Sequence, residues 1–169
     1  MIIIKISGII FLILSGILSG IFISHRNLNH IYFLEEYISF LSNFKTEIKY
    51  TQKPIINILK NYEKEKYLFP LIQNCICLMQ KTDFKTSWEQ TFSGLYKIYG
   101  ITPREEYIIK NFASKVGTSD IQSQINYFNY NISLIKPYLE KLLENKSKNQ
   151  KLPIILGICA SLIISIILI

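Results

Sequence analysis

The sequence predicts an all-α protein, a helical bundle placed between an N-terminal and a C-terminal transmembrane helix. Three observations lead to this class. Apolar residues in the middle of the chain recur at spacings of three and four, the period of a helix. No segment shows sustained strand alternation between hairpin turns. Uncharged apolar runs stand at both ends of the chain.

The two end runs have the length of membrane spans. Residues 6–23 and 152–169 each contain 18 residues without a charged side chain. At about 1.5 Å per residue each helix would be roughly 27 Å long, close to the hydrocarbon core of a bilayer. The first run could instead be a cleaved signal peptide, but its apolar core is longer than usual and no A-x-A-like site follows it. We therefore expect transmembrane helices at 1–23 and 152–169, and a soluble helical domain at 24–151.

The distribution of charge predicts the orientation. The middle segment holds 18 of the 19 Lys and Arg residues and all 12 acidic residues, which gives it a net charge of +6. Basic residues also stand next to both spans on this side: Arg26, Lys146, Lys148 and Lys151. The positive-inside rule places this segment in the cytoplasm and both termini on the outer side, although so long a loop can be exported regardless of charge. The lysines predict contact with membrane lipid and form no basic stripe for nucleic acid.

Prolines divide the first half of the middle segment into helices. A long first helix is predicted to reach about Tyr50. Its apolar seam, interrupted by Lys45, consists of Ile31, Leu34, Ile38, Leu41 and Ile48. Pro54 then opens a short helix to Tyr62, and Pro70 opens another. The charged run at 61–68 between them is predicted to be exposed.

Two further helices are predicted before residue 118. Thr82 or Asp83 caps the first, which ends at Gly100. Its apolar set, with the tryptophan expected in the core, is Phe84, Trp88, Phe92, Leu95 and Ile98. Thr102 caps the second, with proline at the next position and Glu105 completing a capping box. Ile108, Phe112 and Val116 repeat every fourth residue, and Gly117 is a natural residue to follow the helix end because it enters the left-handed region without strain.

A corner and a last helix follow Gly117. Ser119 and Gln122 are spaced as a capping box, and Asp120 places negative charge in the first turn. The apolar seam that begins here alternates steps of four and three: Ile121, Ile125, Phe128, Ile132, Ile135, Leu139 and Leu142. Pro137 should kink or briefly interrupt this helix. One glycine without a P-loop lysine is weak support for an anion site, so we interpret the segment as a corner.

The residues predict neither catalysis nor metal binding. His25 and His30 are five apart and share no helix face, and the cysteines are interpreted as small buried hydrophobes. The adjacent pairs Glu35 with Glu36 and Glu105 with Glu106 are interpreted as solvated faces or caps. No zinc, paired-cysteine or calcium motif occurs. We expect no enzyme activity, no cofactor, no metal and no small-molecule substrate.

Two segments resemble the stage III sporulation protein AB family, membrane proteins of endospore-forming bacteria. The first, "LSNFKTEIKYTQKPIINIL", is similar to the family through Glu47, Ile48, Tyr50 and Pro54. The second and more specific, "FASKVGTSDIQSQINYF", is similar through Phe112, Gly117, Ser119, Asp120 and Gln124. Ala113 and Val116 depart from the family's glycine and leucine. The overall layout, Trp88 and the closing apolar run also fit, so the resemblance covers essentially the whole chain.

The resemblance implies a role that composition cannot show. The family belongs to a set of proteins that build a transenvelope complex between mother cell and forespore. It is similar to the cytoplasmic domains of the inner-membrane platform protein of type II secretion and type IV pili, which are helical bundles. The implied partners are other stage III sporulation membrane proteins and the stage III sporulation protein AA ATPase, with the soluble domain in the mother-cell cytoplasm. The motif residues are the candidate partner contacts: Glu47, Tyr50, Pro54, Gly117, Ser119, Asp120 and Gln124. The alternative is a membrane-anchored signalling or lipid-binding adaptor unrelated to sporulation.

Overall fold

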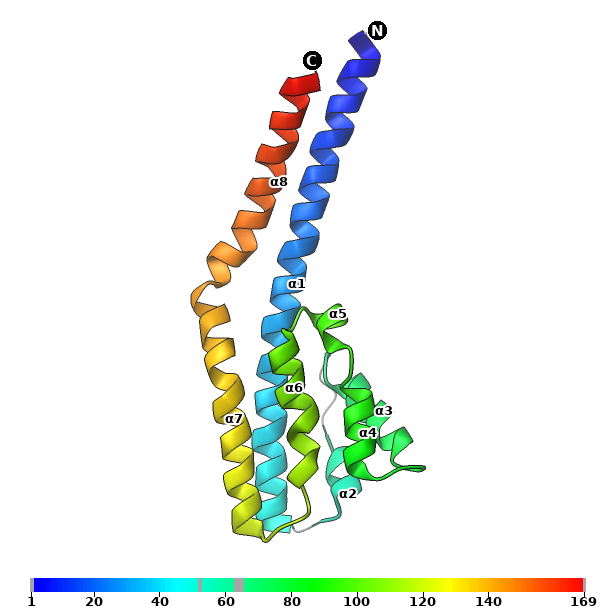
Figure 1. Ribbon diagram of the computed structural model, residues 1–169, viewed down its shortest axis with the longest axis vertical. Coiled ribbons are helices and arrows are strands. Elements are labelled where there is room, and N and C mark those ends of the chain that lie inside the picture. Colours follow the sequence, from blue (N-terminus) through cyan, green and yellow to red (C-terminus); the bar gives the residue numbers. More distant parts are fainter. Residues whose placement is uncertain (1, 52, 63–65, 169) are drawn as a thin grey trace. The chain divides into compact units, whose positions relative to one another are not determined.

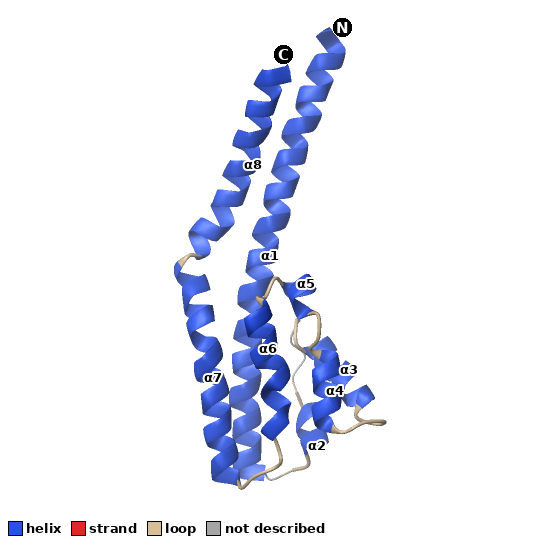
Figure 2. Cartoon of the chain, viewed as in Figure 1, coloured by secondary structure: helices blue, strands red, loops and turns tan. Residues whose placement is uncertain are grey.

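The regular elements of the chain are helices wherever the computed structural model describes it, at residues 2–51, 53–62 and 66–168 (Figures 1 and 2). In chain order they are α1 (Ile2–Thr51), α2 (Ile55–Lys60), α3 (Phe69–Leu78), α4 (Phe84–Thr91), α5 (Leu95–Tyr99), α6 (Pro103–Asn111), the 3₁₀ helix η1 (Phe112–Lys115), α7 (Ile121–Glu144) and α8 (Lys146–Leu168). The all-α class is therefore confirmed, as is the long first helix to about Tyr50.

The chain forms two compact units. Unit 1 consists of Met1–Asn29 and Leu142–Ile169, and unit 2 of His30–Lys141. Helix α1 contributes to both. Within the described ranges, none of the helices combines the length and the apolar character needed to cross a membrane. The predicted spans and their boundaries at residues 23 and 152 therefore stay predictions.

Unit 1 is a pair of antiparallel helices that meet through small residues, with both termini at one end (Figure 1). A Cβ atom added to Gly16 would lie 2.5 Å from the carbonyl oxygen of Gly157, and one added to Gly20 would lie 2.7 Å from the carbonyl oxygen of Pro153. Glycine is required here because any side chain would push the two backbones apart. The large apolar side chains point outward: Ile10, Phe11, Leu14, Leu18, Phe22, Ile155, Leu156, Ile163 and Ile166 are all exposed.

Unit 2 has an aromatic core. The stacked pair of Trp88 and Phe92 has ring centroids 4.0 Å apart, and Phe112 lies 5.2 Å from both Trp88 and Phe128. The core position predicted for Trp88 is confirmed. Helix α1 supplies four aromatic side chains that the predicted seam missed, namely Phe33, Tyr37, Phe40 and Phe44. Their spacing of four, three and four is a second helical seam, so the signal was present in the sequence.

Two of the predicted elements in unit 2 are corrected. Tyr67 and Leu68 are buried, although the run at 61–68 was predicted to be exposed; its residues 63–65 lie outside the described ranges. The helix predicted to end at Gly100 is two helices, because Gly94 adopts a left-handed φ of 80° between α4 and α5. Ile98 is consequently 64% exposed and leaves the predicted apolar set.

The last helix of unit 2 follows the predicted seam in part. Phe128 and Ile135 are buried on α7, together with two polar residues, Gln124 and Asn131. Pro137 lies inside α7 without ending it. Of the cysteines, Cys75 alone is buried, whereas the other two are exposed, so the interpretation as buried hydrophobes is wrong for Cys77 and Cys159.

Candidate functional site

Two segments that are far apart in the sequence meet at one end of unit 2. Helix α1 ends there, Pro54 precedes α2, and the corner before α7 lies beside them (Figure 1). A Cβ atom added to Gly117 would lie 3.1 Å from Cδ1 of Ile55, so the corner packs on the start of α2. We call this region the motif end and define it by seven residues: Glu47, Tyr50, Pro54, Gly117, Ser119, Asp120 and Gln124.

Gln124 closes the corner with its side-chain amide. Its Oε1 accepts from the backbone N–H of Gly117 at 3.1 Å, and its Nε2 donates to the carbonyl oxygen of Ser119 at 2.8 Å. The side chain is buried, so an amide that can both accept and donate satisfies two backbone groups at once. A residue predicted as a possible partner contact therefore has a structural position inside the corner.

Asp120, and not Ser119, is the N-cap of α7. Its Oδ1 accepts from the backbone N–H of Ser123 at 3.0 Å, so the predicted capping box of Ser119 and Gln122 is wrong by one residue. Hydrogen bonds from Ser123, first from its side chain and then from its backbone, hold the pKa of the Asp120 carboxyl below its ordinary value. Asp120 and Ser119 are both exposed.

Gly117 has the predicted left-handed conformation, with φ at 78°. The residue before it, Val116, is extended and follows η1, so the glycine does not directly follow an α-helix as expected. The predicted capping box of α6 is confirmed in full, with Thr102 and Glu105 each accepting from the other's backbone N–H and Pro103 in the first turn.

Helix α1 contributes Glu47 and Tyr50 to the motif end. Tyr50 is 72% exposed, and the ammonium of Lys49 lies 5.0 Å from its ring centroid. Glu47 accepts from the hydroxyl of Thr51 and lies 3.9 Å from the ammonium of Lys53. Glu47 also lines a cavity of about 290 Å³ between α1 and α2, together with Phe40, Asn43, Phe44, Thr46, Ile58, Asn61 and Tyr62. A hollow lined by apolar, amide, hydroxyl and carboxylate side chains therefore adjoins the motif end at Glu47.

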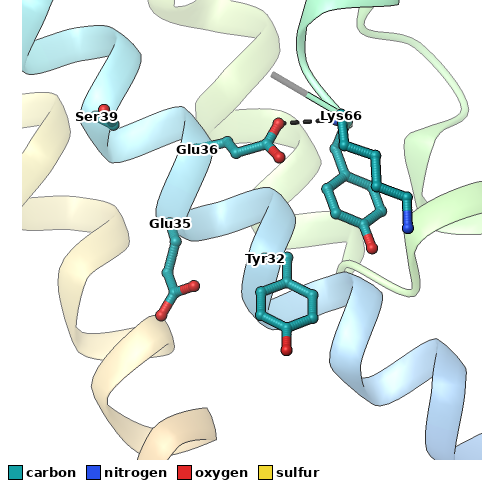
Figure 3. Close-up of a pocket in the computed structure, with 6 residues that line it drawn as sticks. Tyr32, Glu35, Glu36, Ser39 and Lys66 are labelled. Atoms are coloured by element: carbon teal, nitrogen blue, oxygen red, sulfur yellow. Dashed lines mark hydrogen bonds between the residues drawn. The ribbon is translucent and has the colours of Figure 1, made fainter. Parts of the chain in front are cut away.

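A second, wider groove of about 490 Å³ lies beside Tyr32, Glu35, Glu36, Ser39, Lys66 and Tyr67 (Figure 3). Glu36 points across it and accepts from the backbone N–H groups of Tyr67 and Leu68, both at 2.8 Å. Glu35 points away from Glu36 and is exposed. The Glu36 carboxylate therefore attaches the start of α3 to α1.

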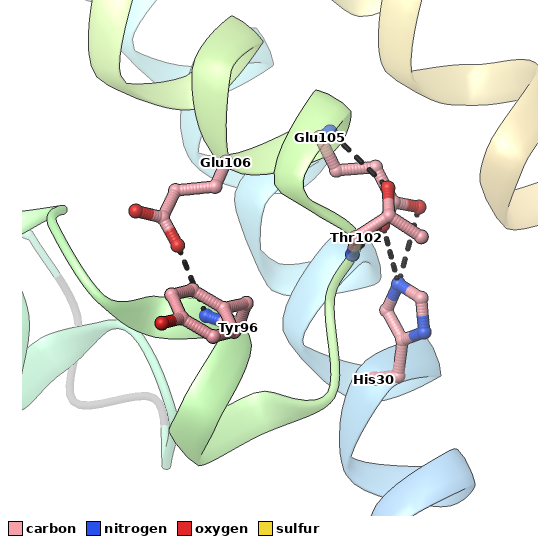
Figure 4. Close-up of polar contacts among 5 residues, drawn as sticks. All are labelled: His30, Tyr96, Thr102, Glu105 and Glu106. Carbon is pink, nitrogen blue, oxygen red and sulfur yellow. Dashed lines mark hydrogen bonds and ion pairs between the residues drawn. The ribbon is translucent and has the colours of Figure 1, made fainter.

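His30 and Glu105 form a buried polar pair between α1 and α6 (Figure 4). The His30 Nε2 lies 3.1 Å from both carboxylate oxygens. Burial raises the pKa of Glu105, but the hydrogen bonds from His30 and from the backbone N–H of Thr102 outweigh burial and leave that pKa below its ordinary value. The sequence carried no signal for this pair, because its members are 75 residues apart.

Each of the two adjacent glutamate pairs contains a residue that joins two elements. Glu36 joins α1 to α3, and Glu105 joins α6 to α1. Glu106 accepts from the backbone N–H groups of Gly94 at 2.8 Å and Tyr96 at 3.1 Å (Figure 4). The interpretation of both pairs as solvated faces or local caps is therefore incomplete, since three of the four carboxylates bind groups more than nine residues away in sequence.

The described part of the chain offers few side chains for metal binding or thiol chemistry. There, no three residues of His, Cys, Asp or Glu are grouped as metal ligands. Burial raises the pKa of the Cys75 thiol to about 12, so this group stays protonated at neutral pH. The expectation of no cofactor and no enzyme activity stays a prediction.

The fold and these contacts define a class: an all-helical bundle whose carboxylates and amides join its own elements, with apolar helices before and after it in the chain. The sequence model of the family described as stage III sporulation protein AB matches residues 5–169. The chain belongs to that family, as the two motif segments predicted, and its role is therefore in sporulation. The alternative of an adaptor unrelated to sporulation is set aside. The comparisons with curated proteins and with solved structures gave no match.

Proposed function

We propose that this protein is a non-enzymatic membrane platform component of the stage III sporulation complex between mother cell and forespore. The observation that carries the proposal is the convergence of the two family-like segments on one end of unit 2. There they combine exposed side chains, Tyr50 and Asp120, with the cavity beside Glu47. The polar residues buried deeper in unit 2, such as Gln124 and Glu105, bind groups of the protein itself.

Membrane attachment is the first part of the proposal. Large apolar side chains cover the outside of unit 1, while its two helices meet at Gly16, Gly20 and Gly157. Close contact through glycines spaced by four is a typical arrangement of helices in a bilayer, where lipid covers large side chains as well as protein does. We propose that the two uncharged runs form a membrane hairpin, with the middle segment in the mother-cell cytoplasm because its flanks are basic.

Docking of a partner is the second part. An interface typically combines an apolar core, aromatic anchors and a polar rim. The motif end offers the exposed ring of Tyr50 and the carboxylate of Glu47, and the hollow that adjoins it adds Phe40, Ile58 and Asn61. We propose that it binds the stage III sporulation protein AA ATPase and that other stage III membrane proteins contact the platform elsewhere.

Binding of the full-length protein in detergent to that ATPase tests the docking proposal. Tyr50→Ala removes the exposed ring, and Asp120→Ser removes a charge while keeping an N-cap residue. We expect the double variant to raise Kd at least about fivefold, since an anchor at an interface is worth more than about 1 kcal/mol. Tyr130→Ala, which removes another exposed tyrosine, should bind like wild type.

The same experiment distinguishes docking from a purely structural role. Circular dichroism of each variant checks that unit 2 remains folded. If the Tyr50→Ala, Asp120→Ser double variant is folded and its Kd equals that of wild type, the motif end is not the docking surface. Equal loss of binding by Tyr130→Ala would mean that the effect is not specific to the motif end, which would contradict the proposed docking surface.

A further inference from the structure

Helices α5 and α6 present apolar and aromatic side chains to solvent on a part of unit 2 that the docking proposal does not use. Tyr96 and Ile98 of α5 are 41% and 64% exposed, and Tyr107 of α6 is 69% exposed. Lys97 lies between the first two in sequence and is also exposed. We call these four residues the α5 surface: Tyr96, Lys97, Ile98 and Tyr107.

Packing on the inner side of α5 keeps Ile98 in solvent. Leu95 is buried, and the ring of Tyr99 stacks on Phe33 of α1 with centroids 4.7 Å apart. Because α5 has only five residues, these two side chains fix which side of it faces the core. A partner that covers Ile98 would therefore remove apolar area from water without rearranging the fold.

A shallow hollow lies between α5 and α6. Its volume is about 210 Å³, and it is lined by Tyr96, Pro103, Glu106, Tyr107 and Lys110. Pockets that hold whole small-molecule ligands usually measure roughly 300–1,000 Å³. The hollow therefore suits one large apolar side chain of a protein partner better than a free ligand.

The carboxylates of this region are bound by donors of the protein itself. Glu105 is buried, and its two carboxylate oxygens lie 3.1 Å from Nε2 of His30. Glu106 accepts from the backbone N–H groups of Gly94 at 2.8 Å and of Tyr96 at 3.1 Å (Figure 4). Both negative charges are thus compensated inside unit 2.

Three cations lie on the same two helices. Lys97 and Arg104 are exposed, and Lys110 lines the hollow. The ammonium of Lys97 is 5.6 Å from the centroid of the Tyr96 ring, so positive charge adjoins the aromatic surface. Tyrosine and arginine are typical anchors of protein interfaces, and complementary charge selects the partner. The surface therefore favours a partner segment that carries carboxylates beside an apolar side chain.

We propose that the α5 surface binds an acidic segment of a partner protein. One large apolar side chain of that segment enters the hollow between Tyr96 and Tyr107, and its carboxylates pair with Lys97 and Arg104. The contact does not depend on the membrane hairpin, because all of these residues belong to unit 2.

The proposed contact is separate from the motif end. Helix α5 meets α1 at Phe33, which is 17 residues before Tyr50, or about 25 Å along the helix. Unit 2 would thus have two docking surfaces, and the one on α5 would select its partner by negative charge.

Fluorescence anisotropy of a labelled peptide tests the contact, with the full-length protein in detergent. The probe is the acidic peptide EEELFEEE. Two matched peptides are EEESSEEE, which lacks the apolar side chains, and KKKLFKKK, which reverses the charge. We expect the probe to bind at least about tenfold more tightly than either matched peptide. Added salt should weaken its binding, because exposed charges are screened.

Substitutions locate the binding surface. Ile98→Ser and Lys97→Glu should each raise the Kd of the acidic peptide at least about fivefold. Lys85→Glu makes the same charge change at an exposed lysine of α4 and should leave the Kd unchanged. Tyr50→Ala should also leave it unchanged, since that ring belongs to the motif end. Circular dichroism checks that each variant is folded.

The outcomes separate this proposal from docking of the ATPase. Absence of acidic-peptide binding to wild type would overturn the α5 contact and leave the motif end untouched. Equal effects of Lys97→Glu and Lys85→Glu would overturn it too, because the peptide would then respond only to net charge. Equal binding of EEESSEEE would mean that the surface binds anions, lipid headgroups included, without an apolar anchor. A dimer that dissociates in Ile98→Ser, without peptide binding, would assign the surface to a second copy of the chain instead.

Discussion

The helices of the two units pack through side chains of opposite size. Unit 2 places its largest side chains inside, with Trp88 in contact with Phe40, Phe92 and Phe112. Unit 1 places its smallest residues inside and its largest outside, as Gly16 and Leu18 illustrate. Water makes the first arrangement favourable, because burying an aromatic side chain removes apolar area from water. The second is favourable where the surroundings are themselves apolar, because close contact between backbones then contributes more than apolar burial.

The polar side chains differ in the same way. In unit 1 the hydroxyls of Ser161 and Ser165 each donate to a carbonyl oxygen three or four residues earlier in the same helix. In unit 2 the side chains of Glu36, Glu106 and Gln124 bind the backbone of another segment or loop. These two hydroxyls of unit 1 are therefore satisfied within one helix, whereas the three side chains of unit 2 connect separate segments.

The largest expected effect is the loss of the central ring of unit 2. Trp88→Ala removes a fully buried side chain and its Nε1–H bond to the carbonyl oxygen of Ile109, which is 2.8 Å long. We expect the free energy of unfolding to fall by about 3–5 kcal/mol. Chemical unfolding of the full-length protein in detergent, followed by circular dichroism, measures it. Tyr130→Ala is the exposed control and should change the value by less than about 0.5 kcal/mol; equal effects would contradict an aromatic core.

The second largest effect is expected from a substitution that disrupts the packing of α1 against α8 in unit 1. Gly16→Leu should force α1 away from α8 toward the roughly 8–10 Å axis spacing of helices that meet through large residues, at a cost of about 1–3 kcal/mol. Electron paramagnetic resonance between spin labels at positions 10 and 163, on a chain without native cysteines, measures the distance between α1 and α8. Gly8→Leu is the matched control, since no atom lies within 4 Å of a Cβ added there. An unchanged distance in Gly16→Leu would mean that the glycine contact does not hold the helices together.

A smaller effect is expected at the corner of the motif end. Gln124→Ala leaves the N–H of Gly117 and the carbonyl of Ser119 without the amide, which should cost about 1 kcal/mol for each lost hydrogen bond. Gln122→Ala removes an exposed amide two residues away, whose bond to Asn126 is 3.3 Å long, and should cost much less. Hydrogen exchange of the residue 117 amide and chemical unfolding measure both. If the two alanine variants are equally stable, the amide of Gln124 does not hold the corner.

The smallest expected effect is a dependence of the free energy of unfolding on pH, which arises from Glu105 in unit 2. Because the folded-state pKa of Glu105 lies below its ordinary value of 4.5, the stabilisation from its carboxylate is present above that pH and is lost as the pH falls through the folded-state pKa. Glu105→Gln should therefore flatten the loss of stability in acid, and His30→Ala should flatten it as well. His25→Ala, which removes an exposed histidine of the same helix, is the control. An unchanged slope in Glu105→Gln would contradict the shift.

Much of the local structure could be predicted from the sequence because its signals are short-range. Thr102, Pro103 and Glu105 start α6 through contacts within three residues of each other, and the structure has all of them. The left-handed Gly117 was equally local. The motif segments by themselves also indicated the family that the whole chain was found to match. Periodicity indicated the class of the fold, since an apolar repeat every three or four residues can be buried in only one kind of element.

Only the tertiary structure decided which groups meet. The local spacing around Glu36 and Gln124 predicts a cap or a solvated face equally well. For Glu105 it predicts the capping box with Thr102 but not the bond to His30. The bond between His30 and Glu105 forms because packed helices bring two distant turns to 3.1 Å. The same packing brought Ile55 against Gly117 and so joined the two motif segments into one surface. A hydrogen bond depends on position within tenths of an ångström, whereas sequence patterns specify only the face of a helix.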